Sequence, residues 1–378
     1  MKNKKMLVLS AYDAISHKLW RERLQALFDD VSWTELSLAP RHFSWRIRGN
    51  SLLWASKEKE LLSQDYDLLI ATSMVDLSSL RGFIPSLAQI PTLLYVHENQ
   101  FAYPTNRSNK QNAELMLVPL YAALCADAVA FNSDFNRRSF LAGADALLKK
   151  LPDQFPESIM EKLQESTVVP VPLPKSEPRS RPASRFEPLS VVWNHRWEYD
   201  KGPELLLAIV SLITRKELRI KLDVVGQQFR QQPREFEEID ELLTIHSDST
   251  AIKRGLFGFV DNSADYHALL SSSDVVLSTA EHDFQGLAVQ EACLKGCVPL
   301  TPDALAYPEY IPPKNRFAAG ANVEATAKAA VAMLISYQDQ KLAGTLVSDV
   351  DLSDYQGDTI KQAYQRKFDD LLGIYFER

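Results

Sequence analysis

The fold of this chain is decided by the stretch Val275-Val-Leu-Ser-Thr-Ala-Glu-His-Asp-Phe-Gln-Gly-Leu-Ala-Val-Gln-Glu-Ala-Cys-Leu-Lys-Gly-Cys-Val-Pro-Leu-Thr-Pro302. Its apolar start, Val275–Leu277, predicts a buried strand. Apolar residues at helical spacing over Leu287–Lys295 predict a helix that ends at Gly296. Val298–Thr301 predicts the next strand. The loop of this strand–loop–helix–strand unit lies at the carboxyl end of a strand, where open parallel sheets bind ligands.

Strands alternate with helices along most of the chain. Further strands are predicted at Met6–Ser10, Val31–Leu36, Tyr66–Ala71, Pro91–Val96, Ala128–Phe131, Ser190–Asn194 and Ile220–Val225, and just before Gly258. Helices are predicted at Ser16–Phe28, Asn50–Leu62, Asn112–Ala126, Ser133–Leu148, Pro203–Thr214, Arg234–Leu243, Ala264–Ser271 and Tyr355–Tyr375. This alternation predicts an α/β fold with doubly wound parallel sheets.

A proline-rich segment divides the alternation into two halves. Six prolines lie from Pro170 to Pro188, and prolines at this density cannot continue a helix or a central strand. A chain of 378 residues is also long for one hydrophobic core. We therefore expect a first domain at 1–172, a linker at 173–188, a second domain at 189–350 and a terminal helical segment at 351–378.

The composition is typical of a globular protein from a reducing compartment. Hydrophobic residues make up 46% and charged residues 24% of the chain, which are ordinary values. The three cysteines are too few and too oddly numbered for a disulfide framework, which favours the cytoplasm. No apolar run is long enough to span a bilayer, so we expect no membrane association. A net charge of −7 argues against a generally basic nucleic-acid-binding surface but allows a local basic patch.

Two carboxylates stand out in the opening stretch, Asp283 in its loop and Glu291 in its helix. An ionised carboxylate only accepts hydrogen bonds, and it can hold two neighbouring hydroxyls of a sugar. The backbone N–H groups of Phe284–Ala288 lie at the helix N-terminus, which suits diphosphate oxygens. The alternative is that Asp283 caps the helix and that Glu291 is a solvated helix residue.

Two cations follow the first strand of the second half. Arg196 and Lys201 lie at the carboxyl end of that strand, where both can neutralise a diphosphate. The alternative is that they form surface ion pairs with Glu198 or Asp200.

Cations and aromatic rings are interleaved ahead of the helix predicted at Asn50–Leu62. Arg41, Arg46 and Arg48 alternate there with Phe43 and Trp45. Phosphate-binding cations beside stacking rings suit single-stranded or looped RNA. The alternative is an exposed loop whose aromatic side chains pack inward.

Polar residues end two strands of the first half. His97 follows one strand, and Asn132 with Ser133 follows another. These side chains are candidates for substrate contacts, or in the second case for capping the helix that follows. His17 near the start of the first helix is a further polar candidate.

The spacing of Asp283 and Glu291, with Arg196 and Lys201 ahead of it, resembles retaining glycosyltransferases of family 4, which have the GT-B fold. The resemblance implies two Rossmann-like doubly wound domains facing a central cleft, with a C-terminal helix crossing back to the first domain. It also implies that Glu291 holds the nucleotide ribose and that Asp283 holds donor-sugar hydroxyls. The family usually has glutamate where Asp283 stands, and aspartate is shorter by about 1.5 Å.

Other phrases resemble a narrower group, the tRNA-queuosine α-mannosyltransferases. They are Phe43-Ser-Trp-Arg46, Tyr95-Val-His-Glu-Asn-Gln100, Phe131-Asn-Ser-Asp-Phe-Asn136, Trp193-Asn-His-Arg-Trp-Glu198 and Tyr307-Pro-Glu309. The resemblance implies transfer of mannose from the nucleotide-sugar GDP-mannose to queuosine in a tRNA anticodon, with no metal and no other cofactor. The chain departs from GT-B enzymes in its first loop, Tyr12–Ile15, which contains no glycine.

The residue patterns and the resemblance together give three sets of candidate site residues. The catalytic set is His97, which would reach toward the donor sugar, with Arg196, Lys201 and Asp283. The donor-binding set is Phe284, Gln285, Gly286, Leu287 and Glu291. The acceptor or tRNA-binding set is His17, Arg41, Trp45, Arg46, Arg48, Asn132 and Ser133.

Two other functions remain open from the sequence. The first is a GT-B glycosyltransferase that acts on a lipid or a polysaccharide. Such enzymes commonly expose an apolar and basic helix to membranes, and no clear one is found in the first half. The second is a non-catalytic tRNA-binding protein on a decayed transferase fold, against which the presence of Arg196, Lys201 and Glu291 argues.

Overall fold

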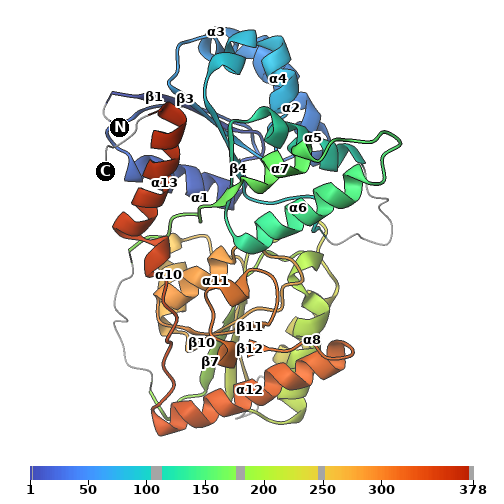
Figure 1. Cartoon of the computed structure of the whole chain (residues 1–378). Coiled ribbons are helices and arrows are strands. Elements are labelled where there is room, and N and C mark those ends of the chain that lie inside the picture. Colours follow the sequence, from blue (N-terminus) through green and yellow to red (C-terminus); the bar gives the residue numbers. More distant parts are fainter. Residues whose placement is uncertain (2, 104–112, 176–183, 246–251, 374–378) are drawn as a thin grey trace. The chain divides into compact units, whose positions relative to one another are not determined.

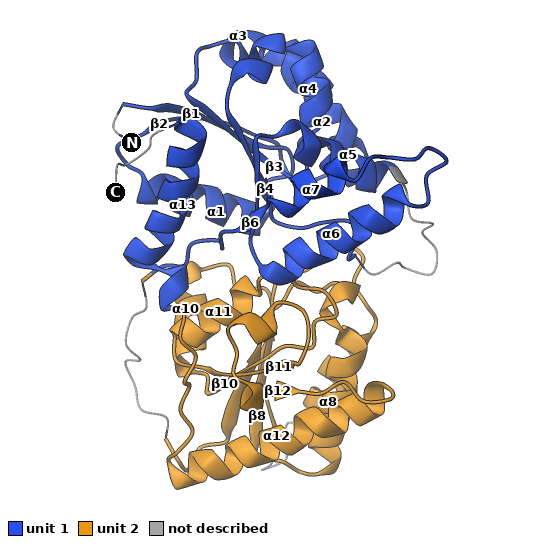
Figure 2. Cartoon of the chain, in the orientation of Figure 1, with its two compact units in different colours: residues 1–174, 353–378 blue, residues 175–352 orange. Residues whose placement is uncertain are grey.

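A computed structural model describes residues 1, 3–103, 113–175, 184–245 and 252–373 (Figure 1). The chain forms two compact units, Met1–Pro174 with Ser353–Arg378, and Lys175–Leu352 (Figure 2). The second unit is therefore inserted between the body of the first unit and its last helix. Asn112, residues 176–183 of the predicted linker, and residues 374–378 beyond the last described helix lie outside the described residues.

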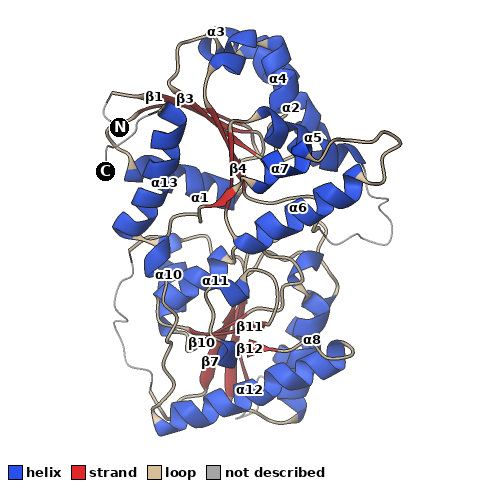
Figure 3. Ribbon diagram, viewed as in Figure 1, coloured by secondary structure: helices blue, strands red, loops and turns tan. Residues whose placement is uncertain are grey.

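Unit 1 is built on a six-stranded parallel sheet with strand order β2-β1-β3-β4-β5-β6 (Figure 3). Its strands are β1 (Lys5–Ser10), β2 (Ser32–Ser37), β3 (Leu68–Thr72), β4 (Thr92–Val96), β5 (Ala128–Phe131) and β6 (Thr167–Val168). Its helices are α1 (Ile15–Leu27), α2 (Phe43–Lys57), α3 (Lys59–Leu62), α4 (Leu77–Phe83), α5 (Ala113–Cys125), α6 (Asp134–Leu148), α7 (Ser158–Gln164) and α13 (Gly357–Leu372). Because β3 lies on the opposite side of β1 from β2, the strand order reverses at β1, and the loops after β1 and β3 flank the point of reversal.

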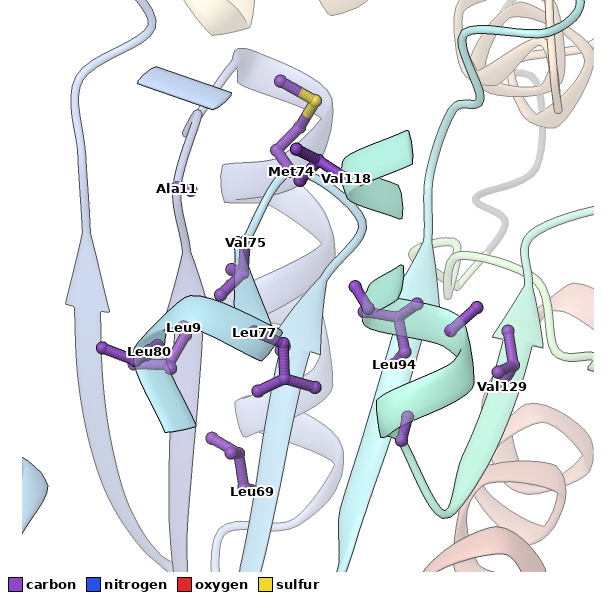
Figure 4. Packing of buried hydrophobic residues seen from close by; sticks show 14 of the residues in the cluster. Leu9, Ala11, Leu69, Met74, Val75, Leu77, Leu80, Leu94, Val118 and Val129 are labelled. Atoms are coloured by element: carbon purple, nitrogen blue, oxygen red, sulfur yellow. The ribbon is translucent and has the colours of Figure 1, made fainter. Parts of the chain in front are cut away.

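Helices cover both faces of this sheet. β3 and β4 are buried along their whole length, as central strands of a doubly wound sheet are. On one face Leu69 and Leu94 lie in the same core as Leu77 and Leu80 of α4 (Figure 4). On the other face α13 lies beside α1, and its Phe368 packs against Phe28, with 5.2 Å between ring centroids (Figure 1).

Unit 2 is built on a second six-stranded parallel sheet with strand order β12-β11-β10-β7-β8-β9. Its strands are β7 (Leu189–Trp193), β8 (Ile220–Val225), β9 (Ile252–Gly258), β10 (Val275–Leu277), β11 (Val298–Pro302) and β12 (Arg316–Phe317). Its helices are α8 (Pro203–Arg215), α9 (Glu235–Ile245), α10 (Ser263–Ser272), α11 (Leu287–Leu294) and α12 (Val323–Ala343). The strand order reverses between β7 and β10, so the loops after these two strands flank the position where such sheets bind ligands.

Alternate residues of the unit 2 strands enter two separate cores. Val191 and Val275 pack in a cluster with side chains of α8 and α12. Val192 and Val276 pack on the other face, in a cluster that includes residues of α10 and α11. This period of two is what a sheet covered on both faces requires. The expected α/β fold class with two doubly wound sheets is confirmed.

The helix predicted at Asn50–Leu62 has the wrong bounds, and the structure divides its residues between α2 and α3. The helix expected at Asn50–Leu62 begins at Phe43, so Trp45, Arg46 and Arg48 lie on α2 and not in a loop. The residue before the helix, His42, has a left-handed backbone with φ 56° and makes no side-chain capping hydrogen bond. The usual sequence signature of a helix start is therefore missing. In the described parts of the chain, no helix is long and apolar enough to cross a membrane.

Candidate active site

Lys201 is fixed by the two loops that flank the strand reversal in unit 2. Its ammonium group donates to the carbonyl oxygen of His282 at 2.7 Å. Its Nζ lies 3.3 Å from Oδ2 of Asp200 and 4.0 Å from Oδ2 of Asp283. The side chain is buried, so an ammonium group is held between two carboxylates at the carboxyl edge of the sheet.

The two loops lie so close together that the residue after Lys201 has to be glycine. Gly202 has φ 63°, and a Cβ atom there would lie 2.0 Å from the carbonyl oxygen of Thr279. The Thr279 hydroxyl donates to the carbonyl oxygen of Lys201 at 2.8 Å and accepts from the indole nitrogen of Trp193 at 2.9 Å. These contacts fix the backbone that carries the Lys201 side chain.

Arg196 lies on the same edge but is more open than Lys201. Its guanidinium group pairs with Glu198 at 2.8 Å and lies 3.8 Å from Asp200. The ion pair considered as the alternative in the sequence is therefore present. Even so, 41% of the Arg196 side chain remains exposed, which leaves surface for a bound anion.

Asp283 has partners on both of its carboxylate oxygens. Oδ1 accepts from the backbone N–H of Gly286 at 3.0 Å, and Oδ2 accepts from the hydroxyl of Tyr307 at 3.1 Å. Burial raises the pKa of this carboxyl, but the positive charge of Lys201 and the hydrogen bond from Tyr307 outweigh it, so the pKa lies below its ordinary value. Asp283 thus fixes the turn ahead of α11 as an ionised carboxylate, but it is not the cap of that helix, because the N-cap is Gly286, which makes no side-chain capping hydrogen bond.

The remaining donor-binding candidates surround the start of α11. Gly286 is the N-cap with φ 77°, and the first N–H groups of α11, beginning at Leu287, follow it at the positive end of the helix. Phe284 is buried with its ring edge-on to His282, at 4.4 Å between centroids. The Gln285 amide donates to the side-chain oxygen of Gln290 at 2.9 Å, which fixes the turn into the helix.

Glu291 lies one turn into α11 and is half-buried. Its charge contributes to the raised pKa of Tyr266 on α10, after the larger effect of burial. Tyr266 accepts a hydrogen bond from Asn194 at 3.0 Å, and the same amide donates to the carbonyl oxygen of Ala288 at 2.9 Å. Glu291 is therefore near a polar group that links the loop after β7 to α11.

Sequence reasoning gave no place in the site to three groups that belong to it: Asp200, His282 and Tyr307. The histidine is neutral, because burial and then the charge of Lys201 lower its pKa to about 4. The same two causes lower the pKa of His195 to about 4. Asp200 and His282 adjoin the predicted Lys201 and Asp283 in sequence, which is a usable signal. Tyr307 reaches Asp283 across the tertiary structure, and no local pattern predicts that contact.

In unit 1, His97 is enclosed by three aromatic rings. Its imidazole stacks on that of His17 at 4.1 Å, and it meets Trp20 and Tyr95 edge-on at 4.7 Å each. Burial, and then the neighbouring His17, lower the pKa of His97 well below its ordinary value, so the ring is neutral. Within the described part of the chain, its Nε2 atom is buried and has no hydrogen-bond partner.

His17, predicted on the acceptor side, is therefore placed against His97. Its side chain is buried, and it supports the neighbouring imidazole. The structure brings these two predicted residues together, although they come from α1 and from the loop after β4.

A chain of amides holds the backbone at His97. The Asn132 amide donates to the carbonyl oxygen of His97 at 2.9 Å, and its own oxygen accepts from Asn136 at 2.8 Å. The hydroxyl of Ser133 accepts from the backbone N–H of Asn136 at 3.0 Å and so caps α6. Ser133 therefore makes the capping contact that was its alternative, whereas Asn132 supports the backbone at His97.

The cations and aromatic residues at 41–48 differ in how available they are. Arg41 is exposed and Arg46 is half-buried, and the Trp45 side chain is 57% exposed. Arg48 pairs with Asp76 at 3.1 Å and with Glu114 at 3.2 Å, so its charge is largely neutralised. Within this group, Arg41, Trp45 and Arg46 are the more available to an RNA.

Family models match both units. Residues 5–173 match the model described as the N-terminal part of tRNA-queuosine alpha-mannosyltransferase, and residues 177–343 match the model described as glycosyl transferases group 1. A tRNA-queuosine alpha-mannosyltransferase of Drosophila melanogaster is 30% identical over 327 residues, which cover 82% of this chain and 83% of that protein.

Solved structures share the fold at much lower identity. Sucrose-phosphate synthase from Thermosynechococcus elongatus has a TM-score of 0.69 and 13% identity, covering 99% of this chain and 100% of its own. HepE from Anabaena, in complex with UDP and glucose, has a TM-score of 0.65 and 14% identity, covering 97% of this chain and 100% of its own. At these identities the likeness shows the fold alone, which is GT-B. The Drosophila relative, which is similar along most of both chains, and the two family models show the family: this protein is a hexosyltransferase of the tRNA-queuosine alpha-mannosyltransferase family, within the group 1 glycosyltransferases.

Proposed function

We propose that the protein transfers mannose from GDP-mannose to queuosine in a tRNA anticodon. The observation that carries this proposal is the match of residues 5–173 to the N-terminal model of the family. Group 1 glycosyltransferase domains alone are compatible with many acceptors, whereas the N-terminal model is described for one activity. The three cysteines are free thiols, which favours the cytoplasm as the place of the reaction.

The donor is assigned to unit 2. Lys201, Arg196 and the N-terminus of α11 supply positive charge for the diphosphate, and Asp283 and Glu291 accept hydrogen bonds from sugar and ribose hydroxyls. Because these groups are already fixed before the reaction, they stabilise the charge that develops as the sugar–phosphate bond breaks.

The proposed transfer retains the anomeric configuration and needs no metal ion. The acceptor hydroxyl forms the new bond on the face from which the diphosphate departs, and a departing phosphate oxygen takes the hydroxyl proton. Positioning and charge stabilisation then account for the catalysis, and the cations Arg196 and Lys201 take the charge-neutralising role. His97, neutral and enclosed, is assigned to a contact with the donor sugar.

The tRNA is assigned to unit 1. The net charge of −7 means that an anionic partner has to be bound by a local surface. Arg41 and Arg46 would hold phosphates of the anticodon loop, and Trp45 would contact an unpaired base. Arg48 should contribute less to phosphate binding than the sequence predicts, because Asp76 and Glu114 neutralise its charge.

The test incubates the purified protein with GDP-mannose and with tRNA that either contains or lacks queuosine, followed by mass spectrometry of the nucleosides. We expect a hexose on queuosine only, and none on the tRNA that lacks it. UDP-glucose and UDP-galactose in parallel reactions test the choice of donor. Equal labelling of both tRNAs would contradict the proposed acceptor. Labelling of neither, with transfer to a lipid or polysaccharide instead, would favour the other class of glycosyltransferase.

A further inference from the structure

The Trp45 indole on α2 covers a glycine one helical turn further on. A Cβ atom built at Gly49 would lie 2.3, 2.6 and 2.7 Å from Cε2, Cζ2 and Cδ2 of Trp45, and these are its three nearest heavy atoms. Cε2 is bonded to three other ring atoms, so another atom can approach it this closely only from above the ring. The indole therefore lies with one face against the backbone of α2 at Gly49.

Glycine at position 49 provides room for the indole, and the backbone conformation there does not require it. Gly49 lies inside the helix Phe43–Lys57, where glycine is less stable than alanine because it loses more conformational freedom on folding. Its φ is not among the positive values found in the chain, so an L-residue can adopt its conformation. What a side chain at position 49 would displace is the Trp45 ring.

The indole is exposed in this arrangement. An indole is a large apolar group that normally gains stability from burial, yet 57% of the Trp45 side chain is open to solvent. Arg41, also exposed, and Arg46, half-buried, are close to it in sequence. An aromatic ring that is backed by the helix on one face and open on the other can stack on an unpaired nucleobase. Cations near the ring can bind the phosphate next to that base.

This part of α2 is joined to the loops at the carboxyl edge of the sheet. Phe43 meets Tyr12 of the loop after β1 edge-on, at 5.5 Å between ring centroids. The Asn50 amide donates to the carbonyl oxygen of Met74 at 3.1 Å, and its oxygen accepts from the backbone N–H of Asp76 at 3.1 Å. Both partners belong to the loop after β3. The start of α2, which carries Trp45, is thus held at the edge of unit 1 that also carries His97.

We propose that Trp45 and Gly49 form a stacking platform for one unpaired nucleobase of the RNA acceptor, and that Gly49 is required for it. The inference rests on the proposed function, in which unit 1 binds the tRNA. It adds a positioning residue, Gly49, which makes no contact with the RNA and acts through the Trp45 indole. A side chain at position 49 would push the indole off the helix and remove its supported face.

The test uses Gly49→Ala, for which stability and binding are expected to change in opposite directions. Thermal unfolding should occur at the same temperature or higher, because alanine is the better helix former and the exposed indole can move away. The Kd for queuosine-containing tRNA should rise about tenfold, as for the loss of one base stack. The Kd for GDP-mannose should not change.

The matched control is Gly82→Ala on α4. A Cβ atom there would meet nothing within 4 Å, so this variant makes the same chemical change on another helix of unit 1 and should bind tRNA like the wild type. Trp45→Leu should weaken tRNA binding as much as Gly49→Ala, and the double variant should be no weaker than either single variant.

Wild-type affinity for tRNA in Gly49→Ala, or additive losses in the double variant, would overturn the platform.

Binding of a single-stranded oligonucleotide, measured by tryptophan fluorescence, tests the platform independently of the proposed queuosine acceptor. If queuosine is not mannosylated but oligonucleotide binding still depends on Gly49 and Trp45, the platform stands and the proposed acceptor fails. If the wild type binds no RNA, both fail.

Discussion

The indole nitrogen of Trp20 donates a hydrogen bond of 2.9 Å to the hydroxyl of Tyr364, and so joins α1 to the last helix of the chain. Tyr364 in turn donates to the carbonyl oxygen of Pro170 at 3.0 Å. Its ring stacks near that of Tyr95, at 6.1 Å between centroids. Trp20 and Tyr95 are two of the three rings that enclose His97, so the position of α13 helps to set the position of that imidazole.

Tyr364→Phe should therefore reduce turnover through His97. The substitution leaves the buried indole N–H of Trp20 without its acceptor, which costs about 1–3 kcal/mol of folding stability. We expect kcat to fall, because the imidazole no longer makes its proposed contact with the donor sugar, while the affinity for GDP stays unchanged, because unit 2 carries the nucleotide site. The control is Lys361→Ala, which also removes a contact of α13, because the Lys361 ammonium group lies over the Phe28 ring at 5.6 Å from its centroid, outside the rings around His97. Equal kcat values in wild type and Tyr364→Phe would contradict a positioning role.

Substitution of Lys201 should lower the stability of the fold, whereas substitution of Arg196 should not. Lys201→Ala removes the buried partner of Asp200 and Asp283 and should lower both the free energy of unfolding and turnover. Arg196→Ala removes a partly exposed group and should lower turnover with little change in stability. We expect a loss in kcat of about two to three orders of magnitude for each, as for other preorganised charge stabilisers.

Urea unfolding and steady-state rates measure the two effects. Arg254→Ala, which removes an ion pair with Asp240 elsewhere in unit 2, is the control and should leave turnover unchanged. Near wild-type turnover in Arg196→Ala and Lys201→Ala would remove these cations from the diphosphate site.

Asp283 should be sensitive to both charge and length. Asp283→Asn removes the negative charge and one acceptor oxygen, so transfer should fall by about two orders of magnitude, while GDP affinity is retained because Glu291 and Arg196 remain. In Asp283→Glu the carboxylate extends past Gly286 and Tyr307, its present partners, and activity should also fall. Tyr307→Phe keeps the carboxylate and should show a smaller loss. Full activity in Asp283→Asn would exclude the sugar-binding role.

Buried neutral histidines, among them His195 and His282, should make the protein less stable in acid. Burial, and then Lys201, lower the pKa values of His195 and His282 from 6.5 to about 4. Between these values the unfolded chain binds protons that the folded chain does not, so stability falls as the pH drops from 6.5 to about 4. The slope is about 1.4 kcal/mol per pH unit for each histidine.

Urea unfolding across this pH range checks the effect. His282→Asn should make the slope shallower, whereas His267→Gln, at an exposed position on α10, should leave it as it is in the wild type. A wild-type stability that does not change between pH 6.5 and pH 4.5 would contradict the prediction.

The sequence by itself determined the elements whose signals are local. Val275–Leu277 is a strand at the predicted residues, and the helix predicted over Leu287–Lys295 ends one residue earlier. Apolar runs, helical spacing and glycine at helix ends are properties of neighbouring residues, and they fix strands and helices before any tertiary contact forms. The order of these elements also placed Arg196, Lys201 and Asp283 at strand ends, so their meeting at one edge of the sheet could be expected.

Only the tertiary structure decided the rest. β6 (Thr167–Val168) and β12 (Arg316–Phe317) have two residues each, and they are strands only because they pair with β5 and β11. The rings around His97 come from α1 and β4. Tyr364 supports them from α13, and Tyr307 reaches Asp283 from beyond β11. The Trp45 indole can lie against α2 only because Gly49 has no side chain. Each of these relations depends on where a side chain meets others in space, and the burial, hydrogen bonds and charge that follow from such contacts exist only once the chain has folded.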